Sequence, residues 1–292
     1  MMLAHVSIPS TVSAPLRVAH PVRSGTASLA VERVSGVSAV TSVRATSPLK
    51  LLIPRTRGSS VWAFVSSLGG GLVAGDETSV DVRLGAKTRC FLSTQASTKV
   101  YRNPDSRPCG HHLVGWLDSD SLLVLAPDPV QAFAGSRYAQ HQEFHLQPGA
   151  GLVLVDWLSS GRSARGERWA FAQFRSRNEV FFGDERRLVD SLLLDPADGK
   201  LDSAQRLGRF NCLALIALFG NPMREAAARL LDEEGARPVG RRARLISSGS
   251  PLREGALLRL AGESTEEVAD EIHRRLGFLF GLLDGDPWSR KW

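Results

Sequence analysis

The chain has 292 residues, of which 43% are apolar and 23% are charged, and these are ordinary values for a globular protein. Its net charge of +6, from 36 basic and 30 acidic residues, comes without a Lys/Arg-rich block interleaved with aromatic residues, which argues against nucleic-acid binding. The longest apolar run, residues 212–220, is too short for a membrane span, and the three cysteines are too few for a disulfide framework, so a reducing compartment such as the cytoplasm is expected.

The composition along the chain predicts three regions. Residues 1–24 are rich in Ser, Val and Pro and contain no acidic residue, so a flexible N-terminus is expected, with an organelle transit peptide as the alternative. Residues 25–205 mostly alternate apolar and polar side chains between Gly, Pro, Asp and Ser turns, which is typical of a β-rich body. Residues 206–292 are expected to form an α+β region packed on that body, within one structural unit.

Three hairpin-like segments in the β-rich region share one design. Residues 78–94 alternate, turn at Gly85 and Ala86, and continue as a second strand; residues 112–128 and 142–158 repeat this pattern. The turns near 85, 119 and 149 are spaced by roughly 30 residues, and each copy pairs a half-polar strand with an apolar one. A single copy cannot bury its apolar strand, so the sequence predicts a mainly β fold of stacked sheets coiled like a β-solenoid.

The C-terminal region predicts a β-α-β-β-α order with two helices on one face of a sheet. A buried strand over 209–220 precedes a helix with Asn221 as its N-cap and Pro222 in its first turn, ending at Gly235. A strand pair follows, and residues 264–267, "STEE", fit a capping box for a second helix. The apolar stripe expected on that helix consists of Val268, Ile272, Leu276, Leu279 and Leu283.

The glycine-rich stretch 69–102 does not fit a nucleotide phosphate loop. In its "GAKT", Ala86 separates Gly85 from Lys87, and the alternation on both sides predicts a hairpin instead of the helix that a phosphate loop requires. The glycines at 69–71 and 75 are expected to allow close backbone approach or positive φ, and Asp76 to accept backbone N–H groups in a turn.

A dense polar segment, residues 93–99, follows these glycines. As a strand it would present a row of hydroxyl and amide groups on one face, and such a row is costly to bury unless it is paired or hydrated. The segment therefore indicates a hydrated interior or a surface that meets another protein. An exposed edge strand is the alternative.

The sequence contains no recognisable catalytic motif, because it lacks a G-x-S-x-G elbow, an HExxH helix motif and paired CxxC motifs. Cys109, His111 and His112 are candidate ligands for nickel, copper or zinc, and residues 141–145, "HQEFH", add two histidines. Residues 161–167 form a second polar cluster, whose alternative interpretation is a structural Arg–Glu network.

Several ordered motifs resemble a known family. They are "TSPLKLLIPR", "GGGLVAGD", "LSTQASTKVYR", "APDPVQAFAGSRYAQ", "GRSARGE" and "NEVFFGDERRLVDSLLLD". In this order they resemble motifs of the urease accessory proteins called UreD or UreH, and the resemblance covers about residues 28–292. Ala74 departs from the family's usual glycine, and the end "DPWSRKW" only partly follows the family's Pro-Arg-x-Trp close.

The resemblance implies a non-catalytic, cytoplasmic maturation factor that helps nickel reach the urease active site. It implies as partners a UreF-like protein, a UreG-like GTPase and the urease apoprotein, with no nucleic acid, no membrane and no tightly bound cofactor, only transient Ni²⁺. The family fold is mainly β and helically coiled, with a C-terminal helical layer. A water-filled passage for nickel through the protein has been proposed for the family.

The residues expected at a polar passage or a partner contact are Asp76, Thr94, Gln95, Ser97, Thr98, Lys99, Tyr101, Asp156, Arg162, Arg165 and Glu167. Within this set, Thr94, Gln95, Ser97 and Asp156 are favoured for transit over the Cys109/His111/His112 cluster, because soft ligands would trap the ion. Two alternatives remain at this point: a stand-alone nickel-storage protein that uses the Cys109/His111/His112 cluster, and an enzyme of unknown chemistry on a β-rich scaffold.

Overall fold

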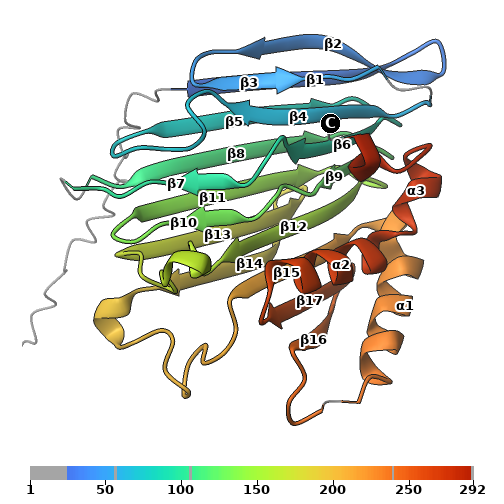
Figure 1. Ribbon diagram of the computed structural model, residues 1–292. Coiled ribbons are helices and arrows are strands. Elements are labelled where there is room, and N and C mark those ends of the chain that lie inside the picture. The colour runs from blue at the N-terminus through green and yellow to red at the C-terminus, as the bar shows by residue number, and fades with distance from the viewer. Residues whose placement is uncertain (1–24, 56–57, 105–106, 239, 291–292) are drawn as a thin grey trace, which may run out of the picture.

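The computed structural model describes residues 25–55, 58–104, 107–238 and 240–290, so the predicted flexible N-terminus lies outside the described residues. Two stacked β-sheets form the body, and the helices lie against one of them (Figure 1). The mainly β architecture with C-terminal helices confirms the predicted fold class. In the described part of the chain, no helix combines the length and the apolar character that crossing a membrane would require.

The first sheet, sheet A, has seven strands in the order β14-β13-β11-β8-β5-β1-β2. Their bounds are β14 (Glu185–Leu194), β13 (Gln173–Phe182), β11 (Arg137–Leu146), β8 (Cys109–Leu117), β5 (Glu77–Leu84), β1 (Gly25–Val34) and β2 (Val37–Ala45). The five strands from β13 to β1 run parallel, and the antiparallel β14 and β2 form the two edges.

The second sheet, sheet B, has ten strands, eight of them in the order β16-β17-β15-β12-β9-β6-β4-β3. Their bounds are β16 (Leu245–Leu252), β17 (Gly255–Gly262), β15 (Cys212–Phe219), β12 (Gly151–Ser159), β9 (Leu122–Leu125), β6 (Arg89–Thr94), β4 (Val61–Ser67) and β3 (Leu49–Leu52). The short strands β7 (Thr98–Val100) and β10 (Val130–Ala132) pair beside the end of β12. Strand β15 pairs antiparallel with β12, so the C-terminal strands extend this sheet.

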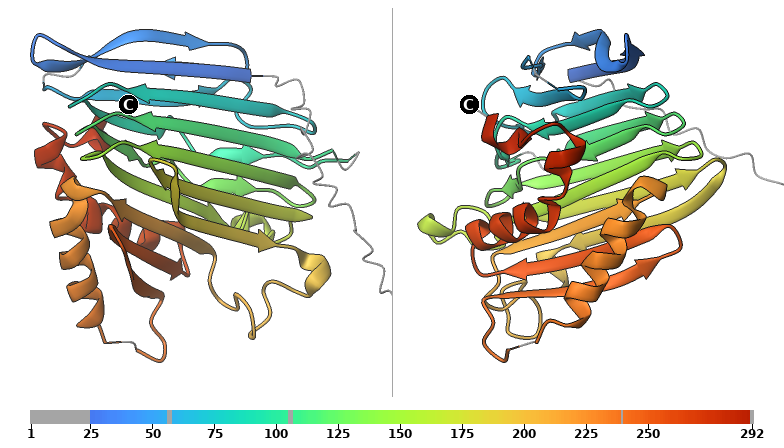
Figure 2. Two further views of the ribbon diagram at one scale, coloured as in Figure 1. Left: turned by 180° about the vertical axis from the view of Figure 1, so that it is seen from behind. Right: turned by 90° about the vertical axis from the view of Figure 1, so that its right-hand side faces the viewer.

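The chain winds between the two sheets and stacks copies of the same turn in register. On sheet A, Leu84 pairs with Leu117 and Leu117 with Leu146; on sheet B, Cys90 pairs with Leu123 and Leu123 with Leu152. These steps of roughly 30 residues confirm the predicted period. The predicted hairpins are wrong, because the two strands of each copy, such as β5 and β6, lie in different sheets and do not pair. Figure 2 shows the successive turns from behind and from the side.

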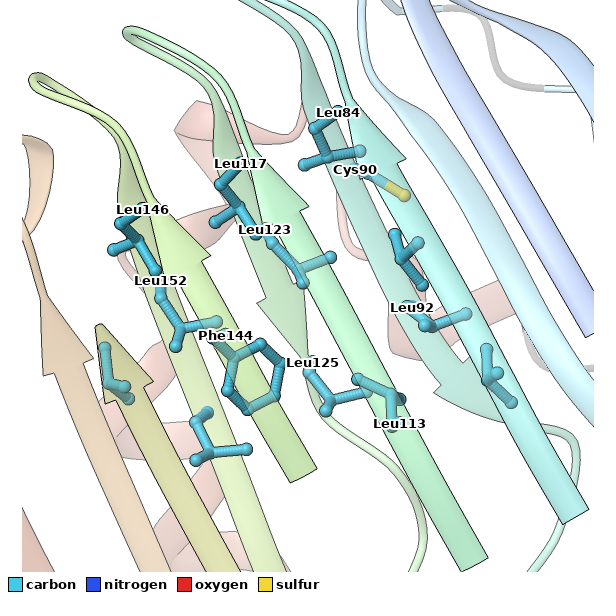
Figure 3. Packing of buried hydrophobic residues seen from close by; sticks show 14 of the residues in the cluster. Leu84, Cys90, Leu92, Leu113, Leu117, Leu123, Leu125, Phe144, Leu146 and Leu152 are labelled. Atoms are coloured by element: carbon cyan, nitrogen blue, oxygen red, sulfur yellow. The ribbon is translucent and has the colours of Figure 1, made fainter. Parts of the chain in front are cut away.

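Buried apolar side chains from both sheets meet between them. Figure 3 shows Leu84, Leu117 and Leu146 from sheet A close to Leu123 and Leu152 from sheet B, and all five are at most 2% exposed. Burying each leucine contributes about 1.5–3 kcal/mol relative to exposure, which is how stacking stabilises turns that could not fold alone.

The helices cover the outer face of sheet B, where a second apolar cluster includes Trp62, Phe91 and Val155 from the strands. The helices are α1 (Arg224–Gly235), α2 (Thr265–Leu276) and the short α3 (Leu279–Leu282). The predicted stripe from Val268 to Leu283 is buried in this cluster, as expected. The prediction of one continuous helix is wrong, because α2 ends at Leu276, Leu279 lies on α3 and Leu283 follows it.

The two predicted helix starts differ in outcome. Ser264 Oγ accepts the Glu267 backbone N–H at 3.1 Å, so Ser264 caps α2 as predicted, while the Glu267 carboxylate pairs with Arg244 at 2.9 Å. Asn221 as an N-cap is wrong, because residues Asn221–Met223 wind as a 3₁₀ turn that starts at Gly220 and α1 begins only at Arg224. The Met223 N–H bonds to the Gly220 carbonyl at 3.0 Å, so this first turn closes without the Asn221 side chain.

Candidate functional site

A polar row interrupts the apolar interior between the sheets. Thr78, His111, Gln140 and Ser176 occupy neighbouring positions on β5, β8, β11 and β13, on the inward face of sheet A. Thr78 Oγ1 lies 2.9 Å from His111 Nδ1, and Gln140 Nε2 donates to Ser176 Oγ at 2.9 Å. Because successive turns stack in register, a polar residue occupies the same position on four neighbouring strands.

Asp156, on β12, faces this row from sheet B. Its carboxylate accepts hydrogen bonds from Gln140 Nε2 at 2.7 Å, Ser176 Oγ at 2.5 Å and Asn178 Nδ2 at 2.8 Å. Burial raises the pKa of Asp156, and the three hydrogen bonds oppose that rise because they favour the charged form. Asp156 is thus a partly buried carboxylate held by neutral donors, without an arginine or lysine among these partners.

Two cavities meet the Asp156 side chain. The first, of about 450 Å³, extends from Asp156 along the inward row, past Thr78 and His111, to residues 93–99. The second, of about 350 Å³, extends from Asp156 and Ser176 toward Asp190, Ser248 and Arg259. Asp156 lines both cavities, so a single carboxylate lies between two hollow regions of the same interior.

Two buried amide oxygens near Asp156 have no hydrogen-bond partner among the described residues. They are Gln142 Oε1 and Asn178 Oδ1, whose residues are 4% and 0% exposed and occupy paired positions on β11 and β13. Buried acceptors in folded proteins are nearly always satisfied, often by water or an ion. These two oxygens therefore indicate that the interior binds water or an ion.

The predicted polar segment lines the first cavity. Thr94, Gln95, Ser97, Thr98 and Lys99 contribute to its wall, together with Asp156. The structure thus brings together the four residues favoured for transit. Their part in nickel transit stays a prediction.

Thr94 has a defined partner in this wall. Its Oγ1 accepts the Asp128 backbone N–H at 2.8 Å and lies 3.2 Å from Asp128 Oδ2. This exchange ties the end of β6 to the segment after β9.

The predicted cluster at 161–167 lies apart from the cavity lining. Arg162 forms a bidentate ion pair with Glu167, and its guanidinium lies 4.4 Å from the centre of the Phe133 ring. Tyr101 packs edge-on against Phe133 at 5.4 Å, and Arg165 is exposed in a 3₁₀ turn, Ser163–Arg165. These contacts match the alternative interpretation, a structural Arg–Glu network.

Asp76 stabilises the glycine-rich turn. Its Oδ2 accepts the Val73 backbone N–H at 2.9 Å, as the sequence predicts for an aspartate in a turn. A Cβ added to Gly71 would lie 2.5 Å from the Lys99 carbonyl oxygen and 2.8 Å from the Tyr101 ring, so the chain approaches this glycine too closely for any side chain.

Cys109, His111 and His112 are not brought together. They lie on β8, where alternation turns Cys109 and His111 inward and His112 outward. Cys109 Sγ donates to the Val73 carbonyl at 2.9 Å, and burial raises the pKa of its thiol. His111 lines the first cavity, whereas the His112 ring lies 5.3 Å from that of His141. The strand's period of two separates the adjacent residues His111 and His112, so the three predicted ligands do not converge.

Sequence reasoning missed five further residues of the interior: Thr78, Gln140, Gln142, Ser176 and Asn178. A signal was present in residues 138–144, where Gln140 and Gln142 share a strand face with Tyr138 and Phe144. Two amides on a face that is otherwise aromatic point to a hydrated patch in the interior.

Comparison with known proteins extends this description. A model of the family described as "UreD urease accessory protein" matches residues 23–290. The chain is 48% identical to "Urease accessory protein UreD" of Sorangium cellulosum over 272 residues, 92% of this chain and 85% of that one. It is 41% identical to the protein of the same name from Anaeromyxobacter sp., over 92% of this chain and 90% of the other. It is also 33% identical to "Urease accessory protein D" of Oryza sativa subsp. indica, over 90% and 95%.

Proposed function

The chain belongs to the UreD family of urease accessory proteins, and from this premise we propose that its polar interior conducts Ni²⁺ toward the urease apoprotein. As a member of this family, the protein is a non-catalytic nickel-insertion chaperone that takes part in urease maturation. The route of the ion is the proposed part.

The observation that carries this proposal is that Asp156 lines both interior cavities. A conducting path has to hold Ni²⁺ weakly, and oxygen ligands bind it less tightly than thiolates. The groups around Asp156 are amides and hydroxyls, supplied by Gln140, Gln142, Ser176 and Asn178. They offset part of the cost of bringing an ion out of water without trapping it.

The Asp156 carboxylate has a specific part in this route. Three neutral donors keep Asp156 in place, while Gln142, whose amide oxygen has no hydrogen-bond partner among the described residues, lines the first cavity. When the Asp156 carboxylate is ionised, an ion at this point meets one negative charge and neutral dipoles, so its positive charge is balanced only in part. Asp156 therefore favours entry of a cation into the apolar interior and still permits its release.

Family membership implies work within a urease maturation complex. We propose that the partners are a UreF-like protein and a UreG-like GTPase, and that the complex acts in the cytoplasm. Residues 94–99 line the first cavity and are partly or fully exposed, and this polar segment is the proposed contact for the UreF-like partner.

The storage alternative depends on a ligand set that is divided between two faces of β8, since Cys109 and His111 point inward and His112 outward. The geometry therefore favours conduction over storage by this cluster.

Asp156→Asn tests the proposed route. The substitution keeps the shape and removes the charge, so nickel incorporation into urease should fall about 10-fold or more, corresponding to about 1.4 kcal/mol of lost stabilisation of the ion. The measurement is the nickel content and activity of urease reconstituted from apoprotein, accessory partners, GTP and Ni²⁺. Asp198→Asn, at an exposed position, is the matched control and should activate urease as the wild type does. Full activation by Asp156→Asn would remove Asp156 from the route.

A further inference from the structure

The outer face of sheet A carries a histidine–carboxylate cluster that is separate from the interior. Strand β11 alternates, so Gln140 and Gln142 point into the molecule while His141, Glu143 and His145 point to the opposite, outer face. These three residues form the motif His-x-Glu-x-His on one face of a single strand. The backbone of the sheet lies between this cluster and the first cavity.

The neighbouring strand β13 completes the cluster. Glu143 pairs in register with Glu179, whose side chain is 9% exposed. His141 Nε2 lies 2.8 Å from Glu179 Oε2, and His145 Nε2 lies 2.5 Å from Glu143 Oε1. Ligand atoms of His141, Glu143 and Glu179 all lie within 4.8 Å of one another. A nitrogen and two carboxylates thus converge without any rearrangement of the backbone.

The surroundings hold these side chains in place. The His145 ring is stacked between Trp116, at 4.1 Å, and Phe181, at 5.0 Å, and nearly parallel to both. Arg177 Nε and Nη2 donate to the two oxygens of Glu179 at 2.9 and 3.0 Å. Hydrogen bonds of this kind orient a carboxylate ligand and limit the reorganisation that binding requires.

The affinity of this cluster for a cation depends on its net charge. Arg177 and Arg186, the latter 3.2 Å from Glu179 Oε1, offset the charge of Glu179, so Glu143 supplies the remaining negative charge. Neutral imidazole and carboxylate together suit borderline divalent ions such as Ni²⁺ and Zn²⁺ better than Ca²⁺ or Mg²⁺, which prefer oxygen alone.

We propose that His141, Glu143 and Glu179 form a divalent transition-metal site on the outer face of sheet A. On binding, the ion takes the place of the hydrogen bond between His141 Nε2 and Glu179 Oε2, and solvent fills its remaining positions. His112, whose ring lies 5.3 Å from that of His141, borders the site. The proposal does not rest on conduction through the interior, since the two sites use opposite faces of β11.

Calorimetric titration of the full chain with NiCl₂ tests this site. His141→Ala and Glu143→Gln should each weaken the binding by about 10-fold or more, at least the loss seen when an orienting partner of a ligand is removed. His273→Ala and Glu32→Gln, both at exposed positions, are the matched controls and should leave the binding unchanged. Asp156→Asn should also retain it, which separates this site from the proposed passage.

Nickel X-ray absorption of the loaded chain provides a second readout that is independent of affinity. The wild type should show imidazole coordination, and His141→Ala should lose it while Asp156→Asn keeps it. Thermal unfolding of each variant checks folding, and Glu143→Gln preserves the side-chain volume in case His141→Ala does not fold. Absence of nickel binding by the wild type, or equal binding by both site variants and both controls, would overturn the proposal.

Discussion

At the scale of single residues, the interior depends on which side chains alternation turns inward. Asp156 stands out in the sequence because it is the one acidic residue in an otherwise apolar strand, residues 151–159. Its partners could not be predicted in the same way. Gln140, Ser176 and Asn178 lie on two other strands, and a single sequence does not specify which strands become neighbours or in which register.

The wall of the first cavity yields a residue-scale prediction. Gln95→Leu and Thr98→Leu should each reduce nickel loading of urease several-fold in a reconstituted system, because both replace a polar wall by an apolar one. Thr41→Leu, at an exposed position of β2, is the control and should load urease fully. If both wall variants also load urease fully, these residues have no part in transit.

At the scale of elements, the repeat of roughly 30 residues was the feature most open to prediction. The positions of strands and turns can be predicted from local alternation and from glycine or proline residues, and a regular repeat supports the same assignment in each copy. The starts of the helices show the limit of local signals. Ser264 caps α2 as predicted, whereas Asn221 does not cap α1, because Gly220 and Pro222 direct the chain into a 3₁₀ turn first.

Stacking of the turns predicts a large cost for truncating an inward side chain. Leu123→Ala should lower the free energy of unfolding by about 2–5 kcal/mol, because Leu123 is 0% exposed and packs between two neighbouring turns. Denaturant unfolding followed by circular dichroism measures this change. Leu193→Ala, at an exposed position on β14, should change stability far less. Equal losses for the two variants would contradict the packing described for the interior.

The cap of α2 predicts a smaller effect. Ser264→Ala removes the acceptor for the Glu267 N–H and should destabilise the protein by about 1 kcal/mol. Asn221→Ala serves as the comparison and should cost less, since its side chain makes no cap hydrogen bond to α1. Thermal unfolding of both variants would show the difference, and a larger loss for Asn221→Ala would contradict the assignment of the caps.

At the scale of the whole molecule, the outer faces of the two sheets differ. The helices cover the outer face of sheet B, while none of the described helices covers the outer face of sheet A, which carries the histidine–carboxylate cluster. Between the sheets, polar positions repeat from turn to turn and line the two cavities that share Asp156. The overall coil was predictable from the repeat and from the family resemblance. That Asp156 lines both cavities could not be predicted, because it depends on how distant turns of the chain stack.

The central claim is that nickel passes through this interior, and plugging either end tests it most directly. Ser97→Trp and Ser248→Trp each place a bulky ring at one of the two cavities, and Ser42→Trp, on the exposed edge strand β2, is the control. The measurement is the nickel content of urease after activation by complexes that contain each variant, with complex assembly checked by pull-down. We predict that both plugged variants assemble but deliver little nickel, while the control delivers the normal amount. Normal nickel content with both plugged variants would contradict conduction through the interior.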